Sequence, residues 1–401
     1  MRVLQINSVC GIGSTGRIAT DIHSILNKHG HDSYIAYGRG VSKNCNKVIR
    51  IGTNYDNYAH VALTRVSDKH GFGSVRATRD FIRKMEEIDP DIIHLHNIHG
   101  YYINIQLLFD YLKKADKPVI WTLHDCWAFT GHCAYFDYAG CDKWKTQCGK
   151  CPEKKSYPAS KLVDNSKENY SKKKTVFSGV KNMTIVTPSR WLAGLVKQSF
   201  LQEYSVEVIN NGIDLEVFKP TTNDIRERYK LGNKFIILGV AGVWDRRKGL
   251  NYFKELSEKL GKDEAIVLVG LTEKQKEGLS DNVIAIPRTS NVKELVDFYS
   301  TADVFVNPTL EDNFPTTNLE ALACSTPVIT FETGGSTESI DCNTGVVVEQ
   351  GSVSGLLHAI KGIKDNVVNN YTTQCRELAL RSYNKEDRYN DYLELYLKIS
   401  R

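Results

Sequence analysis

The chain has 401 residues, of which 41% are hydrophobic and 25% are charged, and it carries a formal net charge of +5. These values are ordinary for a globular protein of two or three domains. No apolar run approaches the roughly 18 residues of a transmembrane helix, and the first residues lack the apolar core of a signal peptide, so we expect a cytoplasmic protein. The mild positive charge comes with no nucleic-acid-binding motif, which argues against a nucleic-acid partner.

The first half of the chain alternates between short apolar strands and helices. The strands are rich in β-branched residues, as the buried strands of parallel sheets are. A glycine-rich loop follows the first strand and leads into a helix expected over residues 17–29. The expected strands are Val3 to Asn7, Ser33 to Tyr37, Asp91 to His96, Val119 to His124 and Thr184 to Thr187.

The glycine-rich loop spells G-x-G-x-x-G with Gly11, Gly13 and Gly16. This spacing is the fingerprint of dinucleotide-binding folds, which also place an acid at the end of the second strand. No acid stands there in this chain, and Arg39 could serve only the phosphate of NADP. A nucleotide-binding oxidoreductase is therefore one alternative, and a tight turn without a ligand is another.

Histidines gather at the ends of the third and fourth expected strands. His94 and His96 are two apart and so share one face of a strand, while His124 ends the next strand beside Asp125. A zinc site built from His94, His96 and His124 is conceivable. Such histidines more often form hydrogen bonds in the polar floor of a cleft, and we favour that interpretation.

Five of the ten cysteines fall within residues 126–151, and the last two form a C-x2-C pair. Such a pair with two further thiolates can hold a tetrahedral zinc ion in a closed site, which is structural and not catalytic. We expect this structural zinc site to consist of Cys133, Cys141, Cys148 and Cys151. The alternatives are disulfide bonds, which the expected compartment disfavours, and free buried thiols.

A lysine-rich segment overlaps the cysteine cluster. Between Lys143 and Lys174 there are ten lysines against three acids. This charge forms either a solvated surface or a contact for anionic lipid head groups or a pyrophosphate-bearing acceptor. The inner surface of a membrane is therefore one candidate partner.

Near Asn210 the alternation of strands and helices starts again, which indicates a second domain of the same class. We expect a doubly wound α/β protein with two Rossmann-like domains that face each other across a cleft. The first domain is expected over residues 1–205 and the second over 206–384. The strands expected in the second domain are Phe235 to Ala241, Ala265 to Gly270, Val283 to Pro287, Val304 to Asn307, Val328 to Phe331 and Val346 to Glu349.

Three cations follow the first strand of the second domain, namely Arg246, Arg247 and Lys248. Three cations at one strand end form either a solvated basic loop or a site for anions such as a diphosphate, which carries about two negative charges or more. The Asp89-Pro90-Asp91 triplet begins a strand, so it is poorly placed to bridge a metal ion to such a diphosphate.

Two acids, Glu311 and Asp312, follow a later strand and precede a helix that starts beyond Pro315. The start of a helix offers unpaired N–H groups to an anion, and nearby carboxylates suit hydroxyl groups. The carboxyl end of a parallel strand is also where open α/β sheets bind ligands. These features suit a nucleotide sugar.

The acidic segment resembles a known family. Asp312 and Glu320 are eight apart, like the two acids of the E-x7-E motif in retaining GT-B glycosyltransferases of family 4, and EDNFPTTNLEALACSTPVITF is similar to that family's donor-site segment. VINNGIDLEVFKP resembles its interdomain N-G-I-D signature. Lys248 matches the lysine of its Lys-Gly pair, whereas Val243 stands where the family usually has an arginine. The resemblance covers the whole chain and is strongest over residues 208–349.

The resemblance implies roles for the matching residues. Asp312 and the backbone after it would contact the transferred sugar, with Glu311 as a possible substitute, and Glu320 would hold the ribose hydroxyls. His124 would position the sugar. The implied catalytic residues are His124, Lys248, Arg247 and Asp312, and the implied donor-binding residues are Gly13, Gly16, Arg246, Lys248, Asn313, Phe314, Thr316, Thr317 and Glu320.

The family implies a hexosyltransferase-type enzyme that moves a sugar from a UDP- or GDP-sugar to a saccharide, with retention of configuration. The acceptor would be linked to a lipid in the assembly of lipopolysaccharide, capsule or another surface polysaccharide, with the enzyme peripheral to the membrane. No metal or cofactor is implied for catalysis. Residues 385–401 would form a helix that returns to the first domain. A non-catalytic binding protein and a sugar-nucleotide epimerase of the same fold are the remaining alternatives.

Overall fold

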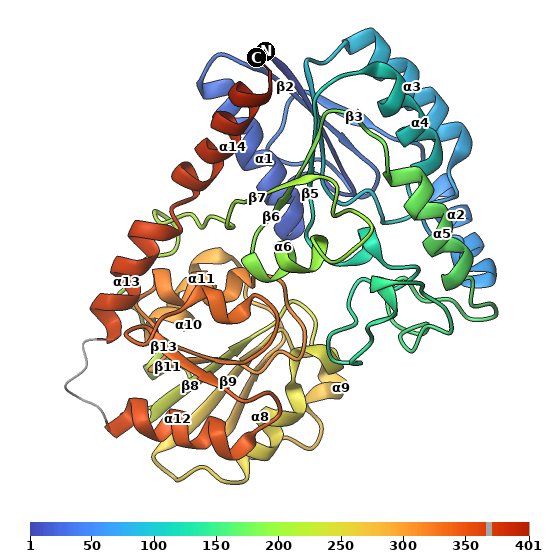
Figure 1. Ribbon diagram of the computed structural model, residues 1–401. Coiled ribbons are helices and arrows are strands. Elements are labelled where there is room, and N and C mark those ends of the chain that lie inside the picture. The colour runs from blue at the N-terminus through green and yellow to red at the C-terminus, as the bar shows by residue number, and fades with distance from the viewer. Residues whose placement is uncertain (366–370, 401) are drawn as a thin grey trace. The chain divides into compact units, whose positions relative to one another are not determined.

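The computed structural model describes residues 1–365 and 371–400. Internal contacts divide the chain into two compact units (Figure 1). Unit 1 comprises Met1–Asn210 together with Glu386–Arg401, and unit 2 comprises Asn211–Lys385. Arg401, which ends the expected C-terminal helix, lies outside the described residues, as do residues 366–370 of the expected second domain.

The sheet of unit 1 has seven parallel strands in the order β3-β2-β1-β4-β5-β6-β7. The chain therefore adds strands on one side of β1 and then returns to add the others on its opposite side. The strands are β1 (Arg2–Asn7), β2 (Asp32–Tyr37), β3 (Val48–Arg50), β4 (Ile92–Leu95), β5 (Val119–Thr122), β6 (Met183–Thr187) and β7 (Ser205–Val208).

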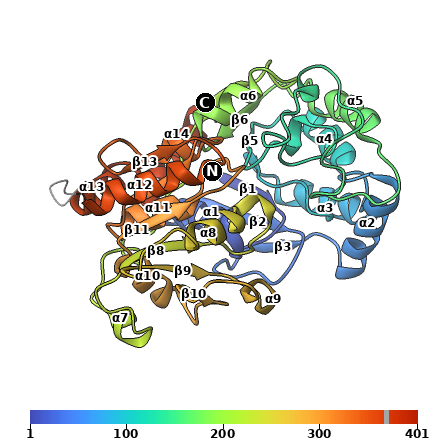
Figure 2. The same cartoon turned by 90° about the horizontal axis from the view of Figure 1, so that it is seen from below.

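Both faces of this sheet are apolar, because its strands are buried on both sides. One face, which includes Leu4 and Ile6, packs against α3, α4 and α5, whereas the other, which includes Val3, packs against α1 and the returning helix α14. In both views α2 lies at the outside of the unit (Figure 1, Figure 2). The helices are α1 (Gly13–Lys28), α2 (Asn54–Ser67), α3 (Val75–Ile88), α4 (Ile105–Ala115), η1 (Trp127–Phe129), η2 (Lys143–Lys145), α5 (Ser166–Phe177), α6 (Arg190–Val196) and α14 (Lys385–Ile399).

The sheet of unit 2 has six parallel strands in the order β10-β9-β8-β11-β12-β13. Both units thus wind outward in two directions from a central first strand, as Rossmann-like sheets do. The strands are β8 (Phe235–Val240), β9 (Glu264–Val269), β10 (Val283–Ile286), β11 (Val304–Asn307), β12 (Val328–Phe331) and β13 (Gly345–Val348).

Helices also cover both faces of the second sheet. Its β-strand residues join α10, α11 and α13 in one apolar cluster and α8 and α12 in another. In the part of the chain that the structure describes, no helix is both long and apolar enough to cross a membrane. The helices are α7 (Ile225–Arg228), η3 (Arg246–Lys248), α8 (Leu250–Ser257), α9 (Glu273–Lys276), α10 (Val292–Thr301), α11 (Thr316–Ala323), η4 (Ser336–Ser339), α12 (Val353–Asp365) and α13 (Tyr371–Ser382).

The two Rossmann-like, doubly wound sheets of the GT-B fold class are confirmed, and the sequence located eleven of the thirteen strands to within one or two residues. The edge strands β3 and β7 were not predicted, because they are short and half-exposed and carry no continuous apolar run. Helix α1 begins at Gly13 and not at residue 17. No side chain among the described residues caps its start, so the usual sequence signal for a helix N-terminus is missing there.

The strand orders give each sheet one topological switch point, where the direction of strand addition reverses. The order reverses between β1 and β4 in unit 1 and between β8 and β11 in unit 2. Doubly wound folds bind ligands beside the loops that leave the carboxyl ends of the strands on either side of such a point. In unit 2 these two loops carry Lys248 and Asp312.

Candidate active site

Lys248 is held at the carboxyl end of β8 by the single turn η3. The Asp245 carboxylate accepts a hydrogen bond from the Lys248 amide at 3.1 Å, and Gly249 ends the turn with φ of 77°. A Cβ atom on Gly249 would lie 2.1 Å from the carbonyl oxygen of Pro308. Only glycine therefore allows the loop after β8 to approach the loop after β11 this closely.

An ion pair joins the same two loops. Nζ of Lys248 lies 2.5 Å from Oδ2 of Asp312, and both side chains are mostly buried. Arg247 donates a hydrogen bond to the carbonyl oxygen of Glu311 at 3.0 Å, while Arg246 is exposed. The structure thus brings together three of the four expected catalytic residues, Arg247, Lys248 and Asp312, and pairs Asp312 with the lysine.

Residues that the sequence analysis missed support the acidic loop. The Thr333 hydroxyl and the Gln350 amide both donate to the carbonyl oxygen of Leu310, at 2.9 and 2.8 Å. A Cβ atom on Gly334, whose φ is 51°, would lie 1.9 Å from the carbonyl oxygen of Asp312. The Gly-Gly turn is visible in the sequence. Thr333 and Gln350 are not, because they lie 23 and 40 residues from the carbonyl that they hold.

Helix α11 follows the acidic loop directly. No side chain of the described residues caps its first turn, so the amide groups at Thr316 and Thr317 point out of the helix start without a side-chain cap. Glu320, one turn further on, is only 4% exposed. Its carboxylate accepts a hydrogen bond from the Tyr299 hydroxyl at 2.9 Å. Tyr299 therefore orients the acid that the resemblance assigns to the ribose.

A buried polar network fastens α11 to the sheet beneath it. The side-chain amide of Asn318 donates to the Ser339 hydroxyl at 2.8 Å, and its oxygen accepts from Asn307 at 2.8 Å. The hydroxyls of Thr330 and Ser336 are hydrogen-bonded at 2.7 Å. Since Asn307 ends β11 and Thr330 lies in β12, the helix cannot shift without breaking buried hydrogen bonds.

In unit 1, His124 follows β5 and contacts a chain of buried polar groups. Gln5 donates to the carbonyl oxygen of Ala19 at 3.0 Å, which turns its own oxygen toward His96 Nε2 at 3.1 Å. His96 Nδ1 lies 3.2 Å from His124 Nε2. Burial keeps both imidazoles neutral: it lowers the pKa of His96 well below the usual value and that of His124 to about 4.

The direction of the hydrogen bonds in this chain follows from the Gln5 amide. Because the oxygen of Gln5 must accept, His96 carries its proton on Nε2, and its Nδ1 can only accept. His124 therefore carries its proton on Nε2, which leaves Nδ1 as the basic nitrogen of that ring. His94 is separate from this chain, since it bonds Tyr396 at 2.6 Å and Thr122 at 2.8 Å.

The two glycines expected at the donor differ in their surroundings. A Cβ atom on Gly13, whose φ is 66°, would meet no described atom within 4 Å. On Gly16 it would lie 3.1 Å from the Gly11 amide nitrogen. Position 13 thus favours glycine because of its left-handed backbone conformation. Position 16 favours glycine because α1 packs closely on the loop that precedes it.

The expected structural zinc site is not supported. Cys133, Cys141, Cys148 and Cys151 line one small hollow of about 10 Å³. However, residues 1–365 and 371–400 contain no group of three or more metal-binding side chains arranged to hold an ion, which also excludes the histidine alternative there. The four sulfurs pack against an aromatic core instead. All ten cysteines are described, and no disulfide bond joins any of them.

The lysine-rich segment is not one uniform charged surface. Lys173 is buried, with its ammonium group 2.8 Å from the Trp127 carbonyl oxygen and 3.4 Å from the centre of the Trp127 ring. Lys143 donates to two loop carbonyls. Several lysines of the segment therefore hold the cysteine-rich loops in place, while others, such as Lys161 and Lys172, are exposed.

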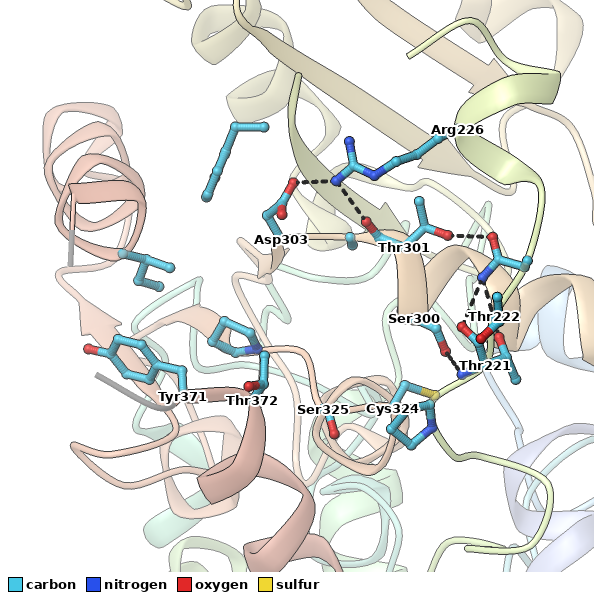
Figure 3. Close-up of a pocket in the computed structure, with 16 residues that line it drawn as sticks. Thr221, Thr222, Arg226, Ser300, Thr301, Asp303, Cys324, Ser325, Tyr371 and Thr372 are labelled. Carbon is cyan, nitrogen blue, oxygen red and sulfur yellow. Dashed lines mark hydrogen bonds and ion pairs between the residues drawn. The ribbon is translucent and has the colours of Figure 1, made fainter. Parts of the chain in front are cut away.

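A large groove of about 1050 Å³ also lies in unit 2, but at the opposite edge of the sheet (Figure 3). It is lined by Phe235, which begins β8, and by Asp303, which precedes β11. The Arg226 guanidinium there bonds Asp303 at 3.1 Å and the Thr301 carbonyl (Figure 3). The groove is thus remote from the carboxyl ends of the strands, where Lys248 and Asp312 lie.

Comparison with known proteins identifies the family. A family model described as Glycosyltransferase Family 4 matches residues 15–217, more than half of the chain, and one described as Glycosyl transferases group 1 matches residues 221–379. The chain belongs to glycosyltransferase family 4. This assignment replaces the oxidoreductase interpretation of the glycine-rich loop.

Individual relatives of this family 4 glycosyltransferase are distant. WcaC of Escherichia coli (strain K12), to which a glycosyl transferase role in colanic acid biosynthesis is ascribed, is 25% identical over 418 residues, covering 100% of both chains. A UDP-Gal:alpha-D-GlcNAc-diphosphoundecaprenol alpha-1,3-galactosyltransferase of Escherichia coli is 25% identical over 51% of this chain and 57% of its own.

Solved structures share the fold. Sucrose-phosphate synthase from Thermosynechococcus elongatus superposes with a TM-score of 0.74 at 18% identity, covering 100% of this chain and 99% of that one. Anabaena HepE in complex with UDP gives a TM-score of 0.71 at 13% identity, covering 99% and 100%.

Proposed function

We propose that this glycosyltransferase transfers a sugar, with retention of configuration, from a nucleotide diphosphate sugar to a hydroxyl of a lipid-linked saccharide. The observation that carries the proposal is the Lys248–Asp312 pair, at 2.5 Å, on the loops that flank the switch point of unit 2. A cation for a diphosphate and a carboxylate for sugar hydroxyls stand side by side there, ahead of the uncapped start of α11.

In the proposed reaction the bond between the sugar C1 and the diphosphate breaks as the acceptor oxygen bonds C1 from the same face. The acceptor proton passes to a diphosphate oxygen. Lys248, with Arg246 and Arg247, stabilises the negative charge that develops on the leaving diphosphate. Asp312, Asn313 and Phe314 contact the sugar.

The remaining roles are proposed one residue at a time. Glu320 accepts hydrogen bonds from the ribose hydroxyls, and the start of α11, at Thr316 and Thr317, contacts the diphosphate. In unit 1, His124 accepts a hydrogen bond from a sugar hydroxyl through Nδ1 and does not act as a general base, because burial lowers its pKa to about 4. We propose separately that Gly13 and Gly16 contact the phosphates of the donor.

Relatives support the substrate classes. One distant relative acts, by its name, on a diphosphoundecaprenol-linked sugar with a UDP-Gal donor, and another is named for capsular polysaccharide biosynthesis. Fold neighbours were solved with UDP and with UDP-glucose. We therefore propose a UDP- or GDP-sugar donor and a place in surface polysaccharide assembly, at the cytoplasmic face of a membrane.

The test is a thermal-shift screen of UDP-, GDP-, ADP-, dTDP- and CMP-sugars with NAD and NADPH included. A ligand at about 100 times its dissociation constant adds about 2.7 kcal/mol of stability. Glu320→Gln, whose amide oxygen can still accept from Tyr299, should abolish the shift, while Glu332→Gln, an exposed control, should keep it. A shift with NADPH alone would overturn the proposal, and failure to turn over any bound donor would favour a non-catalytic binding protein.

A further inference from the structure

Helix α2 presents its polar side inward and its apolar side outward. Its buried side chains are Asn57, His60 and Thr64. Asn57 donates to the Gly38 carbonyl oxygen at 3.0 Å, and the His60 ring lies 2.9 Å from the Ser74 hydroxyl. Surface helices of globular proteins show the reverse arrangement. The inward face of α2 is therefore anchored by hydrogen bonds, and burial of apolar surface cannot explain why its other side is apolar.

The outward side of α2 carries a helical stripe that we call the α2 surface. Tyr55 is 85% exposed, Tyr58 is 70% exposed and Val66 is 54% exposed. Ala59 and Ala62 are exposed between them. The spacing of these five residues, three or four apart around each turn, places them on one face. Two almost fully exposed tyrosines on one face of a helix are an unusual use of aromatic side chains in a monomeric protein.

The apolar surface continues beyond the end of the helix. The Lys161 amide donates to the carbonyl oxygen of Arg65 at 2.8 Å, so the segment that follows lies beside the last turn of α2. There Leu162 is 70% exposed and Val163 is 42% exposed. The patch thus spans two segments that are about one hundred residues apart in the sequence.

The charges around the α2 surface are basic. Lys69, Arg76 and Arg79 are exposed in the segment that follows the helix, and Lys161 is exposed beside Leu162. Of the three acids in residues 54–80, Asp68 is buried, Asp56 is tied to Thr53 in a capping box and Asp80 is paired with Arg83. An apolar helical face with aromatic residues and a rim of lysines and arginines matches the polarity of an anionic lipid surface.

We propose that the α2 surface, with Leu162 and Val163, docks this enzyme on an anionic membrane. The tyrosines and aliphatic side chains enter the interfacial layer, and the basic rim contacts the lipid phosphates. A second copy of the chain is a poorer occupant, because a symmetric contact would bring two basic rims together. The inference deepens the proposed function and rests on it for its biological purpose, which is access to a lipid-linked acceptor. The structural observations on the α2 surface are independent of that function.

The test is co-sedimentation of the full chain with vesicles of phosphatidylcholine alone or mixed with phosphatidylglycerol, without donor or acceptor. Wild-type protein should sediment with the anionic vesicles, and less so at high salt. Tyr55→Ser/Tyr58→Ser and Lys69→Glu/Lys161→Glu should each weaken binding about tenfold or more. The controls in unit 2, Leu380→Ser and Lys259→Glu/Lys262→Glu, alter residues that are also exposed and should bind as wild type.

Three results would overturn the inference. These are no binding to either vesicle, binding that survives loss of both tyrosines, and a concentration-dependent dimer that the tyrosine variant abolishes. Tyr55→Ser alone serves as a second variant if the double variant folds poorly. Donor hydrolysis is measured in parallel without vesicles. If the wild-type protein binds vesicles but hydrolyses no donor, the result would count against the proposed function and would still support the docking surface.

Discussion

Lys248 and Asp312 neutralise each other in the unliganded site. Their side chains are mostly buried and 2.5 Å apart, so neither charge is left without a partner before substrate arrives. An isolated buried charge would be costly. Under the proposed function, a nucleotide sugar would offer its diphosphate to Lys248 and its hydroxyl groups to Asp312, so both residues would exchange partners together.

Replacement of Lys248 by methionine should lower kcat for donor turnover by about 10²-fold or more, because the leaving diphosphate loses its nearest cation. KM for the donor should change less, since backbone groups of α11 and Glu320 remain. Steady-state kinetics of Lys248→Met and of the control Lys254→Met, on the neighbouring helix α8, check this. An unchanged kcat would remove Lys248 from the chemistry.

At the residue scale the sequence could predict groups that carry a motif, but not groups that act through space. Lys248, Asp312 and Glu320 stand at family spacings, and the first two do meet in the structure. Gln5 and His96 set the proton position on His124, yet Gln5 lies 91 residues from His96 in the chain. Nothing in a sequence marks a hydrogen bond across two neighbouring strands. Tyr299 and Gln350 escaped prediction for the same reason.

At the scale of elements, the candidate site consists of the loops after β8 and β11, and glycines allow these loops to pack closely. Gly249 and Gly334 both have positive φ, and each faces a carbonyl oxygen where a side chain would otherwise stand. Thr333 and Gln350 hold the same loop from another side. The loops are therefore largely preformed, which reduces the entropy that donor binding must overcome.

Gly249→Ala should destabilise unit 2 by more than about 1–3 kcal/mol, because the left-handed backbone and the contact with Pro308 both oppose a side chain. The control is Gly362→Ala in helix α12, where a Cβ would meet no described atom within 4 Å. It should be neutral or stabilise by about 0.5–1 kcal/mol. Denaturant unfolding of both variants compares their free energies of unfolding. Equal values would contradict the loop-packing argument.

Lys173 on α5 should give unit 1 a distinct pH response. Burial lowers the pKa of its ammonium group from 10.5 to about 7. Between these two pKa values the unfolded chain binds the proton more often than the folded protein does. This group therefore makes the free energy of unfolding rise with pH, and it destabilises the folded protein most below pH 7. Lys173→Met should therefore increase the free energy of unfolding, relative to wild type, most strongly at low pH.

The measurement is the melting temperature of Lys173→Met and wild type across the neutral and alkaline range. The difference between them should fall as pH rises above about 7, since the folded protein then holds a neutral amine, whose burial carries no cost of desolvating a charge. Lys172→Met, an exposed neighbour, should show no such trend. A difference independent of pH would mean that Lys173 stays charged in the folded protein.

Most elements were predictable because buried parallel strands are continuous apolar runs, and eleven such runs stood out. The cysteine cluster shows the limit of this approach. Its C-x2-C pair reads as a metal knuckle, but the final arrangement depends on Phe129, Phe136 and Trp144, whose rings fill the space around the thiols. Spacing along the chain cannot reveal which neighbour occupies the position of an ion.

At the scale of the whole molecule, the last helix belongs to the first unit. Residues of α14 join Val3, Ile92 and Ile120 in one apolar cluster, and Tyr396 bonds His94, 302 residues away in sequence, at 2.6 Å. The family resemblance led us to expect a C-terminal helix that returns to the first domain. The hydrogen bond to a strand histidine was not predictable from that resemblance.

Tyr396→Phe should lower the melting temperature of unit 1, because a buried ring nitrogen of His94 loses its partner at a cost of about 1–3 kcal/mol. Tyr58→Phe, which alters an exposed hydroxyl on α2, is the control and should melt like the wild type. Differential scanning calorimetry resolves the two. Identical melting of both variants would show that His94 finds another partner.

The return of α14 also sets the order in which the molecule can be completed during translation. Unit 2 is a continuous stretch, Asn211–Lys385, whereas unit 1 needs residues on both sides of it. The ribosome must therefore deliver all of unit 2 before Tyr389, Tyr392 and Tyr396 can cover the sheet face that begins at Val3. Domains usually fold in the order of their synthesis. Here the second unit can reach its native state first, while the first keeps an apolar sheet face uncovered until the final helix emerges.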